Sequence, residues 1–285
     1  MTMVDMTKEP RLAGVMGWPI GHSRSPALHG HWLKRYGIAG AYVALPVRPD
    51  HLERALRALP FLGFVGCNVT VPHKEAAFRA VDLVDHAASR LGAVNTVVVR
   101  PDGSLEGRNT DGEGFRRHLE ASAPAWRAAG RPVLVLGAGG AARAVVGSLA
   151  DMGVPEIRLA NRTDARAEHL VAEFGRPLRS WPWARRVEGL ADCSLVVNTT
   201  QLGMTGQEAL DLPLDPLPAD GVVYDIVYTP LETPLLAAAR RRGHVGVDGL
   251  GMLLHQARAG FAAWFGVEPA VDDALRAAVL ASGAS

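Results

Sequence analysis

The chain is predicted to fold as two α/β domains. Its 285 residues exceed what one hydrophobic core usually organises. Short apolar runs alternate with helical patterns, and the alternation restarts after residue 111. Continuous apolar runs such as Val133–Leu136 indicate strands buried on both faces, as in a parallel sheet covered by helices. Strands and helices that alternate in two blocks predict two α/β domains.

The first block begins with a strand at Leu12–Met16 and a helix that starts at Ser25-Pro26. Ser25 is expected at the N-cap and Pro26 at the first helical position, and Gly37 ends this helix. The later elements follow in order: a strand at 42–45, a helix at 50–59, a strand at 66–71, a helix from 73 and a hairpin over 94–107.

The second block begins with a helix near Gly114–Ala121. Apolar runs predict three of its strands, and a fourth is expected just before Asn161. Two helices close the chain, at Met252–Phe265 and Pro269–Ala281. The three apolar runs lie at 133–136, 195–197 and 222–226.

Composition narrows the range of partners. The net charge is +1, from 30 basic and 29 acidic residues, so no broad electrostatic field favours nucleic acid or an anionic membrane as a partner. Cys67 and Cys193 lack metal-ligand spacing, and no metal site is expected. They could form one disulfide, but two reduced, half-buried thiols fit a cytoplasmic protein better. The polar N-terminus does not resemble a signal peptide, and no apolar window has the ~18 residues of a spanning helix.

The segment VLVLGAGGAARAVVGSLADMG predicts a dinucleotide site. Gly137, Gly139 and Ala142 follow the G-x-G-x-x-G/A spacing between a strand and a helix. The first glycine permits the tight turn, and the second lets backbone N–H groups approach a pyrophosphate at the positive end of the helix. A purely structural turn is the alternative. The predicted contacts within the turn are Gly137, Ala138, Gly139, Gly140 and Ala141.

The residues at the end of the next predicted strand indicate which cofactor is expected. An NAD site would place a carboxylate there to bind the ribose hydroxyl. Instead Asn161, Arg162 and Thr163 follow the strand, with Arg166 one turn later. Arginine binds a phosphate through two parallel hydrogen bonds, so NADP is favoured over NAD. The alternative is a solvated arginine beside an N-cap threonine.

Lys74 is the candidate acid–base group. Reducing a carbonyl needs an acid that protonates the oxygen as hydride arrives. Only three of the 30 basic residues are lysines, so a lysine in a motif-like segment is informative, because arginine cannot release a proton. Asp111 is a candidate partner that would orient the ammonium. The alternatives are a surface lysine and an N-cap aspartate.

Nine segments in this order resemble the shikimate dehydrogenase family. They run from residue 17 to residue 257, which covers nearly the whole chain. The segments are GWPIGHSRSP, GCNVTVPHKEAA, GAVNT, GRNTDG, GAGGAAR, NRT with Arg166, NTTQLGM, YDIVY and DGLGMLLHQA.

The resemblance implies NADPH-dependent, reversible reduction of 3-dehydroshikimate to shikimate in aromatic amino-acid biosynthesis. It implies that Ser23 and Ser25 donate hydrogen bonds to the substrate carboxylate. Thr70 and Lys74 would lie over the ring, with Lys74 as acid and base.

Further residues complete this implied site. Asn95 and Asp111 would bind ring hydroxyls, and Asp111 would also pair with Lys74. Tyr228 and Gln256 would complete the substrate pocket, while Gly249 and the backbone near Ile226 would approach the nicotinamide. The alternative for Ser25 is a helix cap, and the alternative for Asn95 is a turn residue.

The implied architecture has a central cleft between two domains. Residues 1–111 with 247–285 would form the substrate domain, and residues 112–246 a Rossmann-type NADP domain. A monomer or homodimer is expected.

Two other functions stay open. A quinate/shikimate or aminoshikimate dehydrogenase would share every motif, and a non-catalytic dinucleotide-binding regulator would retain the fold. Family members that use quinate commonly carry threonine at the position of Ser25. Members that use NAD carry an acidic residue at the position of Arg162. The Trp/Arg-rich segment 176–186 has no interpretation beyond packing.

Overall fold

The structure is a computed structural model that describes residues 10–21, 23–126 and 130–282. The chain divides into two compact units. Unit 1 comprises Met1–Thr110 with Gln256–Ser285, and unit 2 comprises Asp111–His255. The predicted boundaries lie at 111 and 246, and the second unit boundary instead falls within the helix Leu250–Phe265.

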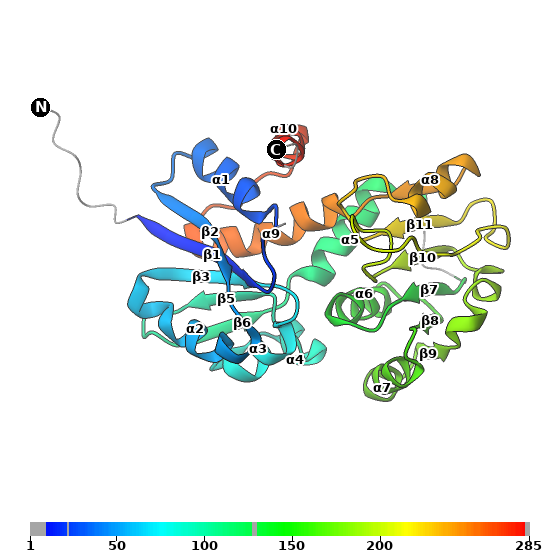
Figure 1. Cartoon of the computed structure of the whole chain (residues 1–285), viewed down its shortest axis with the longest axis horizontal. Helices are drawn as coiled ribbons and strands as arrows, with labels where there is room; N and C mark the ends of the chain where they lie inside the picture. The colour runs from blue at the N-terminus through cyan, green and yellow to red at the C-terminus, as the bar shows by residue number, and fades with distance from the viewer. Residues whose placement is uncertain (1–9, 22, 127–129, 283–285) are drawn as a thin grey trace, which may run out of the picture. The chain divides into compact units, whose positions relative to one another are not determined.

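Unit 1 is built on a six-stranded mixed sheet (Figure 1). The three strands at one side run parallel, and the fourth is antiparallel to both of its neighbours. In sheet order the strands are β2 (Gly40–Pro46), β1 (Arg11–Gly17), β3 (Phe64–Val69), β5 (Thr96–Val99), β6 (Leu105–Arg108) and β4 (Leu83–Val84).

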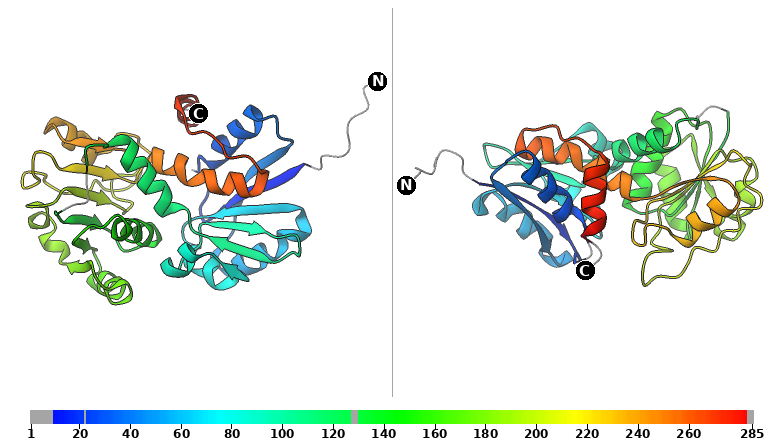
Figure 2. Two further views of the ribbon diagram at one scale, coloured as in Figure 1. Left: turned by 180° about the vertical axis from the view of Figure 1, so that it is seen from behind. Right: turned by 90° about the horizontal axis from the view of Figure 1, so that it is seen from above.

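Helices cover both faces of this sheet (Figures 1 and 2). One face packs leucines and alanines against Met16, Cys67 and Val97 of the strands. The helices there are α2 (Leu52–Ala58), α3 (Lys74–Ala80) and α4 (His86–Leu91). The other face carries α1 (Ser25–Arg35), the unit 1 part of α9 (Leu250–Phe265), and α10 (Asp273–Ala281).

An aromatic cluster forms the core on that second face. Trp32 of α1 lies edge-on to Phe261 of α9 at 5.1 Å between ring centroids, and His29 stacks on Tyr42 at 4.0 Å. Trp264 donates its indole N–H to the Val97 carbonyl oxygen at 3.0 Å. The cluster therefore joins α1 and the C-terminal end of α9 to the sheet.

Unit 2 has a fully parallel six-stranded sheet. Its order is β12 (Val245–Val247), β11 (Val222–Asp225), β10 (Leu195–Asn198), β7 (Val133–Leu136), β8 (Ile157–Ala160) and β9 (Leu178–Trp181). The strand order reverses between β7 and β10, as it does in Rossmann-type sheets. The predicted two-domain α/β fold is confirmed.

Both faces of the parallel sheet are covered, as its apolar strands require. One face packs against α5 (Asp111–Ser122), α6 (Gly140–Asp151) and α7 (Asp164–Phe174). The other packs against α8 (Pro234–Arg241) and leucines between 190 and 217. Single 3₁₀ turns complete the described elements: η1 (Pro49–His51), η2 (Pro60–Leu62), η3 (Trp183–Arg185) and η4 (Glu188–Leu190).

Several sequence predictions need correction. Ser25 is the first residue of α1, and Arg24 occupies the N-cap with no side-chain capping bond, so the predicted Ser25 cap is wrong. The last helix begins at Asp273 and not at Pro269, because the Asp272 carboxylate caps it by accepting the Leu275 N–H. Cys67 and Cys193 are free thiols in different units, and both are fully buried rather than half-buried.

The Trp/Arg-rich segment forms β9 and η3 at the edge of the unit 2 sheet. The buried Arg158 guanidinium lies 4.8 Å from the centre of the Trp181 ring, and Arg186 lies 5.0 Å from that of Trp183. Arginine on an indole face gains cation–π attraction and buries its apolar stem. None of the helices in the described ranges has the length and apolarity to cross a membrane.

Trp264→Phe tests the anchoring of α9. The variant keeps an aromatic ring but loses the buried N–H that binds the Val97 oxygen. Unfolding in urea, monitored by circular dichroism, should show a free energy of unfolding lower by about 1–3 kcal/mol. Trp18→Phe, at a side chain that is 44% exposed, should change it by less than about 0.5 kcal/mol. Equal losses in both variants would contradict the anchoring role.

Candidate functional site

Asn95 is the centre of a buried polar cluster in unit 1. It lies directly before β5 and is 2% exposed. Its Oδ1 accepts the Thr110 N–H at 2.9 Å and the Thr96 hydroxyl at 3.0 Å. Its Nδ2 donates to Thr110 Oγ1 at 2.9 Å and to Gln256 Oε1 at 3.3 Å. The structure thus brings the predicted residues Asn95 and Gln256 together, and Asn95 is more than a turn residue.

Asn68, near the end of β3, extends this cluster and was not singled out in the sequence. Its Nδ2 donates to the Asn95 carbonyl oxygen and to Thr96 Oγ1, both at 3.1 Å. Its Oδ1 accepts the Tyr42 hydroxyl at 2.6 Å. A buried asparagine in the otherwise apolar strand FVGCNV was the available signal, because a buried amide needs partners.

Backbone hydrogen bonds place Thr70 and Lys74 beside this cluster. Val69 donates its N–H to the Asn95 oxygen at 2.8 Å, and Thr70 donates to the Met16 oxygen at 2.9 Å. Lys74 is the first residue of α3, and its carbonyl oxygen accepts the Val94 N–H at 2.9 Å. Residues 69–74 therefore run alongside residues 94 and 95. Lys74 is half-buried at the first position of this helix.

Ser23 and Ser25 lie next to each other at the start of α1. The Ser25 N–H donates to Ser23 Oγ at 3.3 Å. Ser25 is buried, and its side chain interacts with the Tyr42 hydroxyl. Burial raises the pKa of Tyr42 well above its usual value, and this Ser25 interaction opposes the increase. Through Tyr42 and Asn68, the serines share a polar network with Asn95.

The glycine-rich turn in unit 2 has the geometry of a dinucleotide loop. Gly137 has φ +107°, and a Cβ there would lie 2.6 Å from Thr199 Oγ1, so only glycine fits. Gly139 is the N-cap of α6, and a Cβ on it would meet no atom within 4 Å. Open space thus adjoins the N-terminus of a 12-residue helix, where an anion is favoured. Ala138, Gly140 and Ala141 are half-buried around the same turn.

The predicted 2′-phosphate residues lie beside this turn. The Gly137 N–H donates to the Ala160 oxygen at the end of β8, directly before Asn161. Asn161 Nδ2 donates to the Thr163 oxygen at 2.8 Å, which shapes the turn into α7. Thr163 is the N-cap of α7, but its side chain makes no capping bond.

Arg162 in this turn and Arg166 in the first turn of α7 have the exposure needed to reach a bound phosphate. Arg162 and Arg166 are exposed, and neither guanidinium forms an ion pair or hydrogen bond with any residue that the structure describes. Together with the open turn at Gly139, they form a set of donors that fits a phosphorylated dinucleotide.

Ile226 and Gly249 are in contact at the end of β11. A Cβ on Gly249 would lie 2.0 Å from the Ile226 oxygen, so a larger residue would displace this backbone. The Gly249 N–H donates to the Val227 oxygen at 3.3 Å. The half-buried Tyr228 follows in the same segment.

Lys74 and Asp111 belong to different units, and their pairing stays a prediction. Asp111 is buried and is the first residue of α5. No group of three His, Cys, Asp or Glu residues within the described chain could hold a metal ion.

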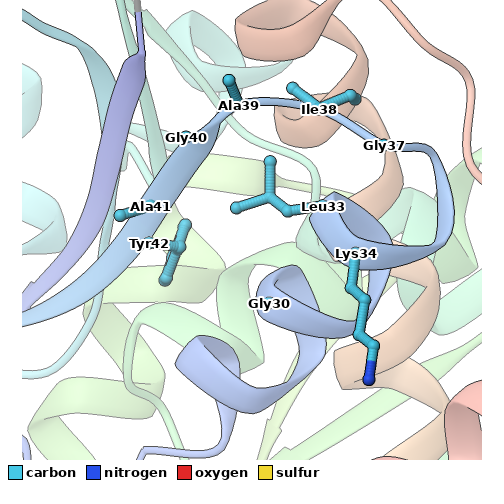
Figure 3. Close-up of a pocket in the computed structure, with 9 residues that line it drawn as sticks. All are labelled: Gly30, Leu33, Lys34, Gly37, Ile38, Ala39, Gly40, Ala41 and Tyr42. Carbon is cyan, nitrogen blue, oxygen red and sulfur yellow. The ribbon is translucent and has the colours of Figure 1, made fainter. Parts of the chain in front are cut away.

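None of the residues that line a surface pocket of about 530 Å³ is a predicted site residue (Figure 3). It is lined by the C-terminal half of α1 and by residues 37–42. Figure 3 shows Leu33 between the helix and the strand, whereas the Lys34 side chain extends away from the strand. The lining is mainly apolar and contains no acid–base pair, so this pocket does not resemble the catalytic site.

Three family models match the chain. Residues 15–97 match the shikimate dehydrogenase substrate-binding domain, and residues 120–203 match shikimate / quinate 5-dehydrogenase. Residues 249–279 match the shikimate 5′-dehydrogenase C-terminal domain. The NADP⁺ shikimate dehydrogenase of Paramagnetospirillum magneticum is 61% identical over 96% of this chain and 100% of that protein. The chain belongs to the shikimate dehydrogenase family.

Solved structures agree with this membership. Shikimate 5-dehydrogenase of Thermus thermophilus, in complex with NADP(H) and shikimate, superposes with a TM-score of 0.85. It is 38% identical, and the match covers 95% of this chain and 99% of that one. A quinate dehydrogenase of Corynebacterium glutamicum in complex with NAD gives a TM-score of 0.88 at 33% identity, over 95% and 99% of the two chains. The predicted family is confirmed.

Asp225→Asn tests an effect of pH on stability. Burial raises the pKa of the Asp225 carboxyl from 3.8 to about 6, against the effect of its hydrogen bonds. The folded chain therefore holds this proton more tightly than the unfolded chain does. The contribution to the free energy of unfolding falls as pH rises from about 4 to 6, by up to about 3 kcal/mol.

Urea unfolding at pH 4.5 and pH 7.5 measures this contribution. The difference between the two pH values should shrink in Asp225→Asn. Asp215→Asn, at a side chain that is 71% exposed, should keep the wild-type difference. An unchanged difference in Asp225→Asn would refute the assignment.

Proposed function

We propose that the protein is an NADP-dependent shikimate dehydrogenase. It reduces 3-dehydroshikimate reversibly to shikimate, a step of aromatic amino-acid biosynthesis. The observation that carries the proposal is the 61% identity, over the full length of the relative, to an enzyme of that name. The buried polar cluster around Asn95 and the open glycine turn at Gly139 give this proposal a physical basis.

Unit 1 supplies groups suited to a small polyol acid. Ser23 and Ser25 would bind the substrate carboxylate, and Asn95 would bind ring hydroxyls. Thr70 would lie over the ring, and Gln256 would help to complete the pocket. Buried neutral donors and acceptors reject analogues that lack a hydroxyl, because the protein groups would then lose their partners. Tyr228 and Asp111 of unit 2 complete the proposed substrate contacts.

Lys74 is proposed as the acid–base group. During reduction its ammonium gives a proton to the carbonyl oxygen as the carbonyl carbon accepts hydride, and the amine takes that proton back in the reverse direction. The Asp111 carboxylate would orient the ammonium.

Unit 2 is proposed to hold NADP. The cofactor, when bound, supplies or accepts the hydride. The turn from Gly137 to Ala141 would bind the pyrophosphate, and Asn161, Arg162, Thr163 and Arg166 the ribose 2′-phosphate. Ile226 and Gly249 would lie at the nicotinamide. We further propose a cytoplasmic monomer or homodimer, with unit 1 as the substrate domain and unit 2 as the NADP domain.

Quinate dehydrogenation is the second candidate. The similarity to a quinate dehydrogenase in complex with NAD favours it. Ser25 and Arg162 favour shikimate and NADP. Initial rates of NADP⁺ and NAD⁺ reduction, with shikimate and with quinate, separate the candidates. Shikimate with NADP⁺ should give the highest kcat/KM, and no turnover from folded protein in any combination would overturn the enzyme proposal.

Lys74→Ala should lower kcat for shikimate oxidation by about 10²–10⁴-fold, the usual contribution of general acid–base catalysis. Binding of both ligands, measured by calorimetry, should change little. Lys34→Ala, at an exposed lysine on α1, is the matched control and should keep wild-type kcat. Near-normal turnover of Lys74→Ala would remove this residue from the mechanism.

Arg162→Ala should raise KM for NADPH about tenfold or more and leave KM for NADH nearly unchanged, because the lost charge-assisted bonds involve only the 2′-phosphate. Steady-state kinetics with both cofactors measures the difference. Arg241→Ala, at an exposed position of α8, controls for the loss of one surface charge. An equal change for the two cofactors would show that Arg162 does not contact the phosphate.

A further inference from the structure

Three neighbouring strands of unit 2, β7, β10 and β11, end at the same level of the sheet. In register, Leu136 of β7 lies opposite Asn198 of β10, and Asn198 lies opposite Asp225 of β11. The glycine-rich turn follows the first strand, and Ile226 follows the third. The polar side chains of Asn198 and Asp225 are both 0% exposed, so their partners lie entirely within the protein.

The Asp225 carboxylate holds three segments together. Its Oδ1 accepts the Val227 N–H at 3.1 Å and Asn198 Nδ2 at 2.9 Å. Its Oδ2 accepts the Thr233 hydroxyl at 2.7 Å. Thr233 is in turn the N-cap of α8. One side chain therefore fixes the peptide after β11, the end of β10 and the start of a helix.

Asn198 carries the same restraint to the loop after β10. Its Oδ1 accepts the Thr200 N–H at 3.0 Å and the Thr200 hydroxyl at 2.7 Å. The preceding Thr199 donates its hydroxyl to the Leu136 oxygen at 2.7 Å, next to the Gly137 turn. The loop is thus tied to both neighbouring strands.

The peptide between Ile226 and Val227 is held from two sides. Asp225 Oδ1 binds the Val227 N–H, and the Ile226 oxygen faces Gly249, where a Cβ would lie only 2.0 Å away. Ile226 N–H also donates to the Asn198 oxygen at 3.0 Å. Little freedom is left for this backbone while the Asp225 bonds are intact.

We propose that Asp225 is a positioning residue that sets the nicotinamide end of the dinucleotide site through the Ile226–Val227 peptide. The inference rests on the proposed function, since it takes Ile226 and Gly249 as the nicotinamide contacts. Asp225 touches neither ligand. Its loss affects the nicotinamide half of NADP and spares the adenosine half, which Arg162 and the glycine-rich turn bind.

Binding of two ligands, measured by calorimetry, separates the nicotinamide half of NADP from the adenosine half. NADP⁺ contains both, whereas adenosine 2′,5′-bisphosphate lacks the nicotinamide. Asp225→Ala should weaken NADP⁺ binding by about 10- to 100-fold, because the Ile226–Val227 peptide is no longer held in place, and change bisphosphate binding by less than about twofold. Asp225→Asn retains an acceptor oxygen for Val227 and Asn198, and should restore NADP⁺ affinity to within about threefold of wild type.

Other variants separate positioning from stability. Thr233→Val leaves the carboxylate but removes the bond to its Oδ2, and should weaken NADP⁺ binding about threefold or more even if Asp225→Ala does not fold. Asp192→Asn makes the same chemical change as Asp225→Asn near the other end of β10, where Asp192 Oδ2 accepts Arg158 at 3.0 Å. It should lower stability without changing either affinity. Arg162→Ala should weaken both ligands.

The outcomes are distinct. Selective loss of NADP⁺ binding in Asp225→Ala or Thr233→Val, with wild-type bisphosphate binding, supports the proposal. Equal weakening of both ligands, or of neither, overturns it. Failure of the wild-type protein to bind NADP⁺ and the bisphosphate would instead overturn the proposed function.

Discussion

A buried polar side chain next to either end of a strand must find hydrogen-bond partners inside the protein, and this constraint organises both units. An unsatisfied buried donor or acceptor costs about 1–3 kcal/mol. In unit 1 Asn95 meets the requirement with Thr96, Thr110 and Gln256. In unit 2 Asp225 meets it with Asn198, Val227 and Thr233. The loops that carry the proposed ligand contacts are held by these bonds.

The proposed substrate site and the proposed cofactor site use different kinds of polar groups. Around Asn95, the proposed substrate contacts are neutral amides and hydroxyls, and Lys74 is the proposed acid–base group. Around the Gly137 turn, backbone N–H groups, a helix N-terminus and two exposed guanidiniums are suited to phosphates. Neutral hydrogen-bonding groups reject an analogue that lacks a hydroxyl, whereas guanidiniums form charge-assisted bonds with phosphate.

Periodicity and motif spacing were sufficient for the four central strands of the unit 2 sheet and for the glycine turn. The run Val133–Leu136 is bounded as predicted, because a strand buried on both faces leaves an unambiguous apolar signal. The edge strands β9 and β12 were not predicted: β9 carries Arg and Ser between apolar residues, and β12 has only three residues. Ser25 was misplaced as a cap, since a serine before proline fits both the N-cap and the first helical turn.

The polar networks were the harder part to predict. Asn68, Asn198 and Asp225 lie in motifs that resemble the family. Their neighbours in the sequence do not show that Asn68 bonds to Asn95, or Asn198 to Asp225, each 27 positions away. Such partners are set by strand order, which spacing alone does not determine. The individual roles of Lys74 and Asp111 rest on resemblance and chemistry.

The most direct test follows the hydride itself. NADPH that carries deuterium at either face of C4 is incubated with 3-dehydroshikimate and the wild-type protein, and the product is examined by mass spectrometry and NMR. Shikimate with one deuterium on the former carbonyl carbon, from one labelled face only, is the expected result. No shikimate from folded protein, or shikimate without deuterium from either labelled cofactor, would contradict direct reduction by bound NADPH.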